Sequence, residues 1–254
     1  MPETLVRIRE PDDKRFLKFY EFLRRNYAGN LVDPERVIRQ ELNDTNEGNY
    51  ETPHAIVVAE DKGRIVAAAS GNLLPVGYQR GGKDIGILFL SYLPPERKGH
   101  EQQVGRAVGE LEEILAGFAS RRGMVAPVLI LEAEPNKVDF YKALGFKTLK
   151  GVNYHQPPFD WDEYGGAESE PERLLLMAKP IEGKAYQADI ARKEKDALRR
   201  GLVGKVGDYL NREWYVPYPE ERNAAANDNI WTTNERLRGK FQKSLGNRKW
   251  VSLR

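Results

Sequence analysis

The chain has 254 residues, of which 31% are charged and 40% hydrophobic, with a formal net charge of +2. This composition is typical of a soluble globular protein with room for one large domain or two small ones. Because cysteine is absent, disulfides, cysteine-based zinc sites and thiol nucleophiles are excluded. The three histidines, His54, His100 and His155, are far apart in the sequence, so we expect no metal site. We interpret His54 and His155 as structural.

No stretch of the sequence predicts an export signal or a membrane span. The N-terminal residues MPETLVRIREPDD lack the apolar core of a signal peptide. The longest apolar runs, such as IVAAA and ILFL, are far shorter than a bilayer requires. We therefore expect a cytoplasmic protein with no membrane contact.

Two helices are predicted near the N-terminus. The first follows Asp12 or Asp13, either of which can cap it. Its apolar side chains recur at helical spacing: Phe16, Phe19, Tyr20 and Leu23. The second follows Asp33-Pro34, a capping residue with proline at the first helical position. Its apolar stripe consists of Val37, Ile38 and Leu42.

Strands are predicted in the middle of the chain. Two β-prone runs flank Asp61-Lys62-Gly63 and indicate a hairpin. A further strand covers residues 84–94, and a helix covers residues 101–121 with an apolar face. Residues 128–134 then form a short buried strand. With the short helix and the strand that follow, the middle of the chain has a strand-helix-strand-helix-strand order, which favours a parallel pair within a mixed sheet, an α/β or α+β fold.

A short helix with Tyr141 follows, and a strand is predicted from Phe146 to about His155. A polar loop leads to Glu172, and LLLMAKP indicates a last strand. Beyond it the composition changes. Residues 182–254 hold 16 Lys/Arg against 10 Asp/Glu, whereas residues 1–181 hold 24 against 28. We therefore predict two parts: a domain of residues 1–181 and a basic, aromatic-containing extension of residues 182–254.

The stretch FYKALGF carries a resemblance to a known family. Tyr141 stands four residues before Gly145-Phe146, in the helix between two predicted strands, and Asn136 opens that helix. Leu93-Pro94 follows the earlier strand as an apolar residue and a proline. In this order and these motifs, residues 5–181 resemble the GNAT superfamily of acyl-CoA N-acyltransferases. The resemblance implies a GNAT-like mixed sheet with helices on both faces, followed by a helical or irregular extension.

The resemblance also implies acetyl-CoA, or a related acyl-CoA, as a co-substrate bound at the start of the helix of residues 101–121. The family's phosphate-binding loop is matched here by HEQQVG, in which Gln103 stands where the family has its first glycine. A second register uses Arg97 or Lys98 with Gly99. The N–H groups and dipole at a helix start favour a pyrophosphate. The cofactor candidates are Tyr92, Leu93, His100, Gln102, Gln103, Val104, Gly105, Arg106 and Asn136.

Acyl transfer to an amine needs a base, an oxyanion donor and an acid for the leaving thiolate. By resemblance, the backbone N–H groups of Tyr92 and Leu93 face the thioester carbonyl, and Tyr141 protonates the thiolate. Glu132 and Glu134 are candidate bases, since strand alternation puts both on one face. The structural alternatives are a Tyr141 that belongs to the core and glutamates at a solvated sheet edge.

The expected acceptor is a small amine or a lysine-bearing molecule. The loop of residues 157–173 holds Asp160, Asp162 and Glu163, which favours a cationic acceptor, although a solvated loop explains it too. The extension mixes basic residues with Trp214, Tyr215, Trp231, Phe241 and Trp250. We expect it to dock on the body or on a second subunit rather than bind nucleic acid. The alternative function is a non-catalytic scaffold of the same fold that acts through this extension.

Overall fold

The computed structural model divides the chain into two compact units, unit 1 (Met1–Leu131) and unit 2 (Glu132–Arg254). Each is described by itself. The residues that the structure describes are 4–27, 32–33, 35–48, 52–80, 83–93, 100–124, 126, 128–156, 172–181, 197–213 and 224–253. The predicted domain boundary after residue 181 falls inside unit 2 and stays a prediction.

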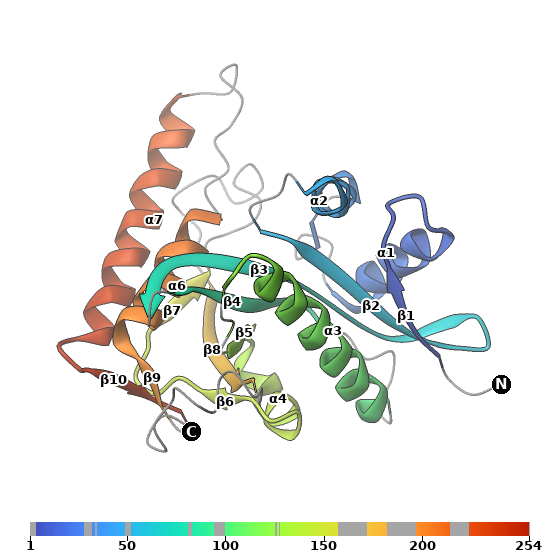
Figure 1. Cartoon of the computed structure of the whole chain (residues 1–254). Helices are drawn as coiled ribbons and strands as arrows, with labels where there is room; N and C mark the ends of the chain where they lie inside the picture. The colour runs from blue at the N-terminus through green and yellow to red at the C-terminus, as the bar shows by residue number, and fades with distance from the viewer. Residues whose placement is uncertain are drawn as a thin grey trace. The chain divides into compact units, whose positions relative to one another are not determined.

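Unit 1 contains a mixed sheet in the order β1-β2-β3-β4-β5 (Figure 1). Its strands are β1 (Thr4–Ile8), β2 (His54–Asp61), β3 (Arg64–Arg80), β4 (Lys83–Tyr92) and β5 (Val128–Ala133). The first four pair antiparallel, and β4 pairs parallel with β5. The predicted hairpin joins β2 and β3, where Lys62 and Gly63 have positive φ angles of 49° and 75°. Helix α3 (Glu101–Arg121) forms the crossover between the parallel strands, as predicted.

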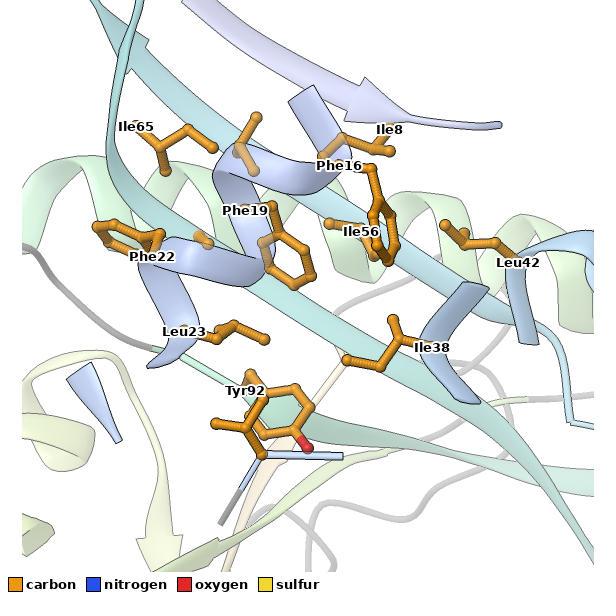
Figure 2. Close-up of a cluster of buried hydrophobic side chains, with 13 residues drawn as sticks. Ile8, Phe16, Phe19, Phe22, Leu23, Ile38, Leu42, Ile56, Ile65 and Tyr92 are labelled. Carbon is orange, nitrogen blue, oxygen red and sulfur yellow. The ribbon is translucent and has the colours of Figure 1, made fainter. Parts of the chain in front are cut away.

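Two helices cover one face of this sheet, α1 (Lys14–Asn26) and α2 (Glu35–Glu47). Asp13 caps α1, since its Oδ1 accepts a hydrogen bond from Arg15 N at 2.8 Å. Figure 2 shows the side chains of both helices meeting those of the sheet in one apolar cluster. Its fully buried members include Phe16, Phe19, Phe22, Leu23, Ile38, Leu42, Ile56 and Val58. Burial of these large side chains stabilises unit 1.

Helix α3 lies on the opposite face of the sheet (Figure 1). Its buried side chains recur every three or four residues: Val104, Ala107, Val108, Leu111, Leu115 and Ala119. Because side chains alternate along β2, Val57 and Ala59 point away from the face of Ile56 and Val58, and they are buried as well. The predicted fold class, a mixed α/β sheet with helices on both faces, is confirmed.

In unit 2, strand β8 (Glu172–Pro180) pairs antiparallel with β6 (Lys147–Thr148) and with β7 (Tyr154–Gln156). The 3-10 turn η2 (Pro135–Lys137) and helix α4 (Val138–Ala143) precede β6. The single strand predicted over residues 146–155 is therefore wrong. A turn at Gly151, whose φ is 69°, divides it into β6 and β7.

The extension forms helices α6 (Arg200–Glu213) and α7 (Ala224–Leu245) and a two-stranded sheet of β9 (Ala197–Arg199) and β10 (Trp250–Ser252). It docks on the segment of residues 149–156. The Phe241 ring meets the Tyr154 ring edge to face at 6.2 Å, and Asn153 N donates to Ser244 Oγ at 2.9 Å. Leu149 pairs with Leu253. Docking of the extension on the body is confirmed for these segments, whereas Trp214 and Tyr215 lie outside the described residues.

Candidate functional site

The end of β4 departs from regular pairing. The parallel ladder joins Leu88, Phe89 and Leu90 to β5, and β4 continues to Tyr92. On its other side, Ser70 of β3 pairs with Tyr92 and Gly71 with Leu90, so Ser91 is an extra residue in β4. Such a β-bulge bends a strand and redirects its side chains, and bulges are frequent next to active sites.

A polar cluster surrounds this end of β4. Tyr92 Oη donates to Asp33 Oδ2 at 2.7 Å and accepts from Asp33 N at 2.8 Å. Burial raises the pKa of the Asp33 carboxyl, although the hydrogen bond from Tyr92 acts the other way. Burial and the Asp33 charge raise the pKa of Tyr92 above its ordinary value. Asp33, predicted only as a helix cap, thus holds the side chain of Tyr92.

The backbone of the next residue is engaged too. Leu93 N donates to the hydroxyl of Tyr27 at 2.9 Å. The Tyr27 ring meets the Tyr92 ring edge to face, with centroids 5.6 Å apart. One of the two backbone donors predicted for a thioester carbonyl therefore has a side-chain acceptor in this structure.

His54 continues the cluster along the same face, at the start of β2. Its Nδ1 lies 3.0 Å from Glu41 Oε2 and 3.1 Å from Asn72 Oδ1. Because both neighbours are acceptors, Nδ1 carries a hydrogen in this arrangement. Ser91 Oγ donates to the same Asn72 oxygen at 3.2 Å. The side chain of His54 is 2% exposed, and its Nε2 has no hydrogen-bond partner in the part of the chain that the structure describes.

Helix α3 starts without a side-chain cap. His100 occupies the N-cap position, its side chain makes no capping hydrogen bond, and its carbonyl accepts from Val104 N at 3.0 Å. His100 Nδ1 is buried and, among the described residues, has no hydrogen-bond partner. Gln102 and Arg106 are exposed, whereas the side chain of Val104 is in the core. The first N–H groups of such a helix have no acceptor within the helix.

In unit 2, the Tyr141 to Phe146 segment ends helix α4. Phe146 N donates to Tyr141 O at 3.1 Å and Gly145 N to Lys142 O at 3.0 Å, while Gly145 has a φ of 90°. This is a Schellman motif, which needs a residue that tolerates positive φ. The spacing of Tyr141 and Gly145 therefore has a structural cause that is independent of any chemistry.

The Tyr141 side chain lies between two aromatic rings, at 5.3 Å from Phe140 and 6.3 Å from Phe146, both edge to face. Burial, and to a smaller extent the charge of Glu134, raises the pKa of the Tyr141 hydroxyl to about 12. The hydroxyl is therefore a weaker acid than that of an ordinary tyrosine and is protonated at neutral pH, the form that a proton donor needs. The structural alternative, a core tyrosine, explains the ring contacts equally well.

The two glutamates predicted as bases differ in their surroundings. Glu132 Oε2 accepts from Gln156 Nε2 at 3.0 Å. Glu134 precedes η2, makes no capping hydrogen bond, and acts electrostatically on Tyr141. Asn136 is exposed within η2.

The predicted site residues thus fall into two groups. Unit 1 holds Tyr92, Leu93 and the residues from His100 to Arg106, and unit 2 holds Glu132, Glu134, Asn136 and Tyr141. Asp160, Asp162 and Glu163 lie outside the described residues, as do Arg97, Lys98 and Gly99.

Sequence reasoning missed four residues around the end of β4: Tyr27, Asp33, Asn72 and Ser91. Two of them are noticeable in the sequence: Asn72 is a polar residue in an apolar strand, and Asp33 precedes a proline. Nothing in the sequence indicates that these two residues lie near the same strand end. The described residues contain no group of three or more potential metal ligands, and no described helix is long and apolar enough to cross a membrane.

No protein-family model matches the sequence, and no curated protein matches it either. Several solved structures are similar in fold. An aminoglycoside 6'-acetyltransferase type Ii shares 18% identity, with 72% of this chain and 99% of that chain covered and a TM-score of 0.46. An acetyltransferase of the GNAT family from Streptococcus pneumoniae shares 16%, with 70% and 100% covered and a TM-score of 0.45. The PaiA N-acetyltransferase from Thermoplasma acidophilum, in complex with coenzyme A, shares 11%, with 71% and 100% covered and a TM-score of 0.44.

Proposed function

We propose that the chain is an N-acyltransferase that moves an acetyl or another acyl group from acyl-CoA to a primary amine by direct attack. The observation that carries the proposal is the end of β4, where Tyr92 and Leu93 follow a bulge and the last residue of the parallel ladder. Backbone N–H groups at a strand end can be fixed toward an oxygen on which negative charge develops. Donors of that kind lower the barrier of acyl transfer.

The start of α3 supports a phosphate-binding role. Its first N–H groups and its dipole favour an anion, and the side chain of His100 makes no capping hydrogen bond to these groups. His100 Nδ1 adds a buried polar atom that has no hydrogen-bond partner among the described residues. In this proposal Gln102, Gln103, Gly105 and Arg106 surround the phosphates of acyl-CoA, Val104 contributes its backbone, and Asn136 contacts the cofactor from unit 2. Acyl-CoA supplies the activated acyl group.

The unit 2 residues supply the proton transfers. Tyr141 donates its proton to the departing thiolate, for which its protonated state at neutral pH is required. Glu132 or Glu134 accepts the proton that the attacking amine loses, directly or through water.

The acceptor in this proposal is a small amine or a lysine-bearing molecule in the cytoplasm. A cationic acceptor is the form that the acidic residues Asp160, Asp162 and Glu163 favour. Neutralising these three residues is expected to raise the KM for the amine and to leave acetyl-CoA binding unchanged.

The test begins with calorimetric titration of acetyl-CoA into the wild type and Tyr141→Phe. Both proteins are expected to bind with micromolar affinity, because Tyr141 acts on chemistry rather than on binding. Release of CoA in the presence of spermidine or a lysine-containing peptide then measures turnover. Tyr141→Phe is expected to lower kcat by about 10²-fold or more, the usual contribution of a positioned acid.

Each failure has a distinct meaning. If neither protein binds acetyl-CoA or longer acyl-CoAs, the acyltransferase proposal is wrong and the scaffold alternative takes its place. If both bind and kcat is the same in the two proteins, the fold binds acyl-CoA but Tyr141 is only a core residue.

A further inference from the structure

Tyr92 and Leu93, at the end of β4, form hydrogen bonds with two residues of the segment between α1 and α2. Leu93 N donates to Tyr27, the C-cap residue of α1, and Tyr92 Oη is bound to both the backbone N–H and the carboxylate of Asp33. All four residues belong to unit 1. The Asp33 contacts fix the Tyr92 side chain, whereas Tyr27 touches the functional backbone group itself.

The geometry at Leu93 is that of an occupied carbonyl site. A backbone amide has one hydrogen to donate, and at 2.9 Å the Tyr27 oxygen accepts it. A thioester carbonyl oxygen that accepted the same hydrogen would need the same position. Leu93 is 3% exposed, so its amide has little access to acceptors from bulk solvent.

Rotation of the Tyr27 side chain can vacate this position without moving the backbone. Tyr27 N is bound to Leu23 O at 2.9 Å, which ties its main chain to α1. Its ring rests edge to face against Tyr92, a contact that a rotation about the side-chain bonds can break.

We infer that Tyr27 is a gate for the acyl group: its hydroxyl holds the Leu93 amide until the carbonyl of an acyl thioester replaces it. This inference rests on the proposed function. Free CoA has no acyl carbonyl and does not compete with Tyr27, whereas acetyl-CoA does. Tyr27 therefore lowers the affinity for acetyl-CoA relative to CoA, and removal of its hydroxyl is expected to shift binding toward acetyl-CoA and away from the product CoA.

The experiment compares calorimetric titrations of acetyl-CoA and of CoA into the wild type, Tyr27→Phe and Tyr20→Phe. Tyr20 lies on the same helix, partly buried at the edge of the apolar cluster, and serves as the matched control. In Tyr27→Phe the ratio of acetyl-CoA affinity to CoA affinity is expected to rise about 2- to 10-fold, the value of one net hydrogen bond. The affinity for CoA alone is expected to stay the same in all three proteins.

A ratio in Tyr27→Phe equal to that of the wild type overturns the gate, while CoA binding itself still supports the proposed function. Absence of binding of both ligands to the wild type overturns the proposed function and the gate with it. A second measurement tests the gate in the wild type, in case the Tyr27→Phe protein does not fold. In wild-type protein labelled with ¹⁵N-leucine, the Leu93 amide resonance is expected to shift with acetyl-CoA and not with CoA. Equal shifts with both ligands contradict the gate.

Discussion

The face of the unit 1 sheet under α1 and α2 has an apolar middle and a polar end that are built from the same strands. On β2, Ile56 and Val58 are fully buried among the side chains of the two helices, and His54, on the same face, begins the polar end. On β3, Ala68 belongs to the apolar cluster, and Asn72 faces His54. Along β2, a step of only two residues, from Ile56 to His54, therefore separates the apolar core from the polar cluster.

The apolar middle and the polar end contribute differently to the stability of the fold. Burial of apolar surface stabilises the middle. A buried polar group costs stability unless it is fully paired, and His54 Nε2 has no partner among the described residues. Natural proteins break such local rules mainly at binding and catalytic sites, and rarely in an apolar core.

The largest effect is expected from the apolar middle. Phe19→Ala removes a fully buried ring and leaves a cavity, so the free energy of unfolding is expected to fall by about 3–5 kcal/mol. Leu17→Ala on the same helix is the control, because Leu17 is 51% exposed and its loss is expected to cost less than about 0.5 kcal/mol. Urea unfolding measures both. Similar losses in the two variants would mean that α1 does not pack as described.

An intermediate effect is expected at Tyr92. Tyr92→Phe removes the hydroxyl that pairs with both the carboxylate and the backbone N–H of Asp33. Because two buried groups lose their partner, stability is expected to fall by about 1–3 kcal/mol. A double-mutant cycle with Asp33→Ala, followed by urea unfolding, is expected to show coupling between the two sites. If the stability losses of the two single variants simply add in the double variant, the hydrogen bonds between Tyr92 and Asp33 do not account for them.

The smallest effect is expected from the charge of Asp33, and it depends on pH. Burial raises the pKa of this carboxyl in the folded state, with Glu41 raising it further and His54 and Tyr92 opposing the shift. The resulting contribution to stability is fully present below the unfolded pKa of about 3.9 and is lost as pH rises through the folded pKa. Asp33→Asn cannot titrate, so its stability relative to the wild type is expected to improve from pH 4 to pH 7. A difference that is constant with pH would contradict a buried, titrating Asp33.

The parts of the fold that the sequence predicted correctly are those with local causes. Helix α3 has an apolar stripe at helical spacing over its whole length, and Asp13 stands directly before the helix that it caps. The Asp61-Lys62-Gly63 turn ends in a glycine, which adopts its positive φ of 75° without strain. Gly145 likewise closes α4 through its own backbone conformation. None of these predictions needed knowledge of a distant residue.

The parts that could not be predicted depend on residues far apart in the chain. Tyr27 and Leu93 are 66 positions apart, and neither carries a local sign of the other. The extra residue Ser91 is visible only once the register between β3 and β4 is known. Strand β1 is short, and strand pairing rather than a strong pattern defines it. The residue roles that the resemblance to the GNAT superfamily implied for Tyr141, Glu132 and Glu134 stay predictions until activity is measured.

Leu149 pairs with Leu253, and Lys150 N donates to Ser252 O at 2.8 Å. Arg248 also bonds the carbonyl of Lys150, 98 residues earlier in the chain. During synthesis at about 5–20 residues per second, the 149–156 segment waits roughly 5–20 s for these partners to be made. All residues of unit 1 are synthesised before that interval begins, because the unit ends at Leu131. Contacts of this kind in unit 2 can form only near the end of synthesis, and until then the 149–156 segment is open to chaperones and to premature pairing.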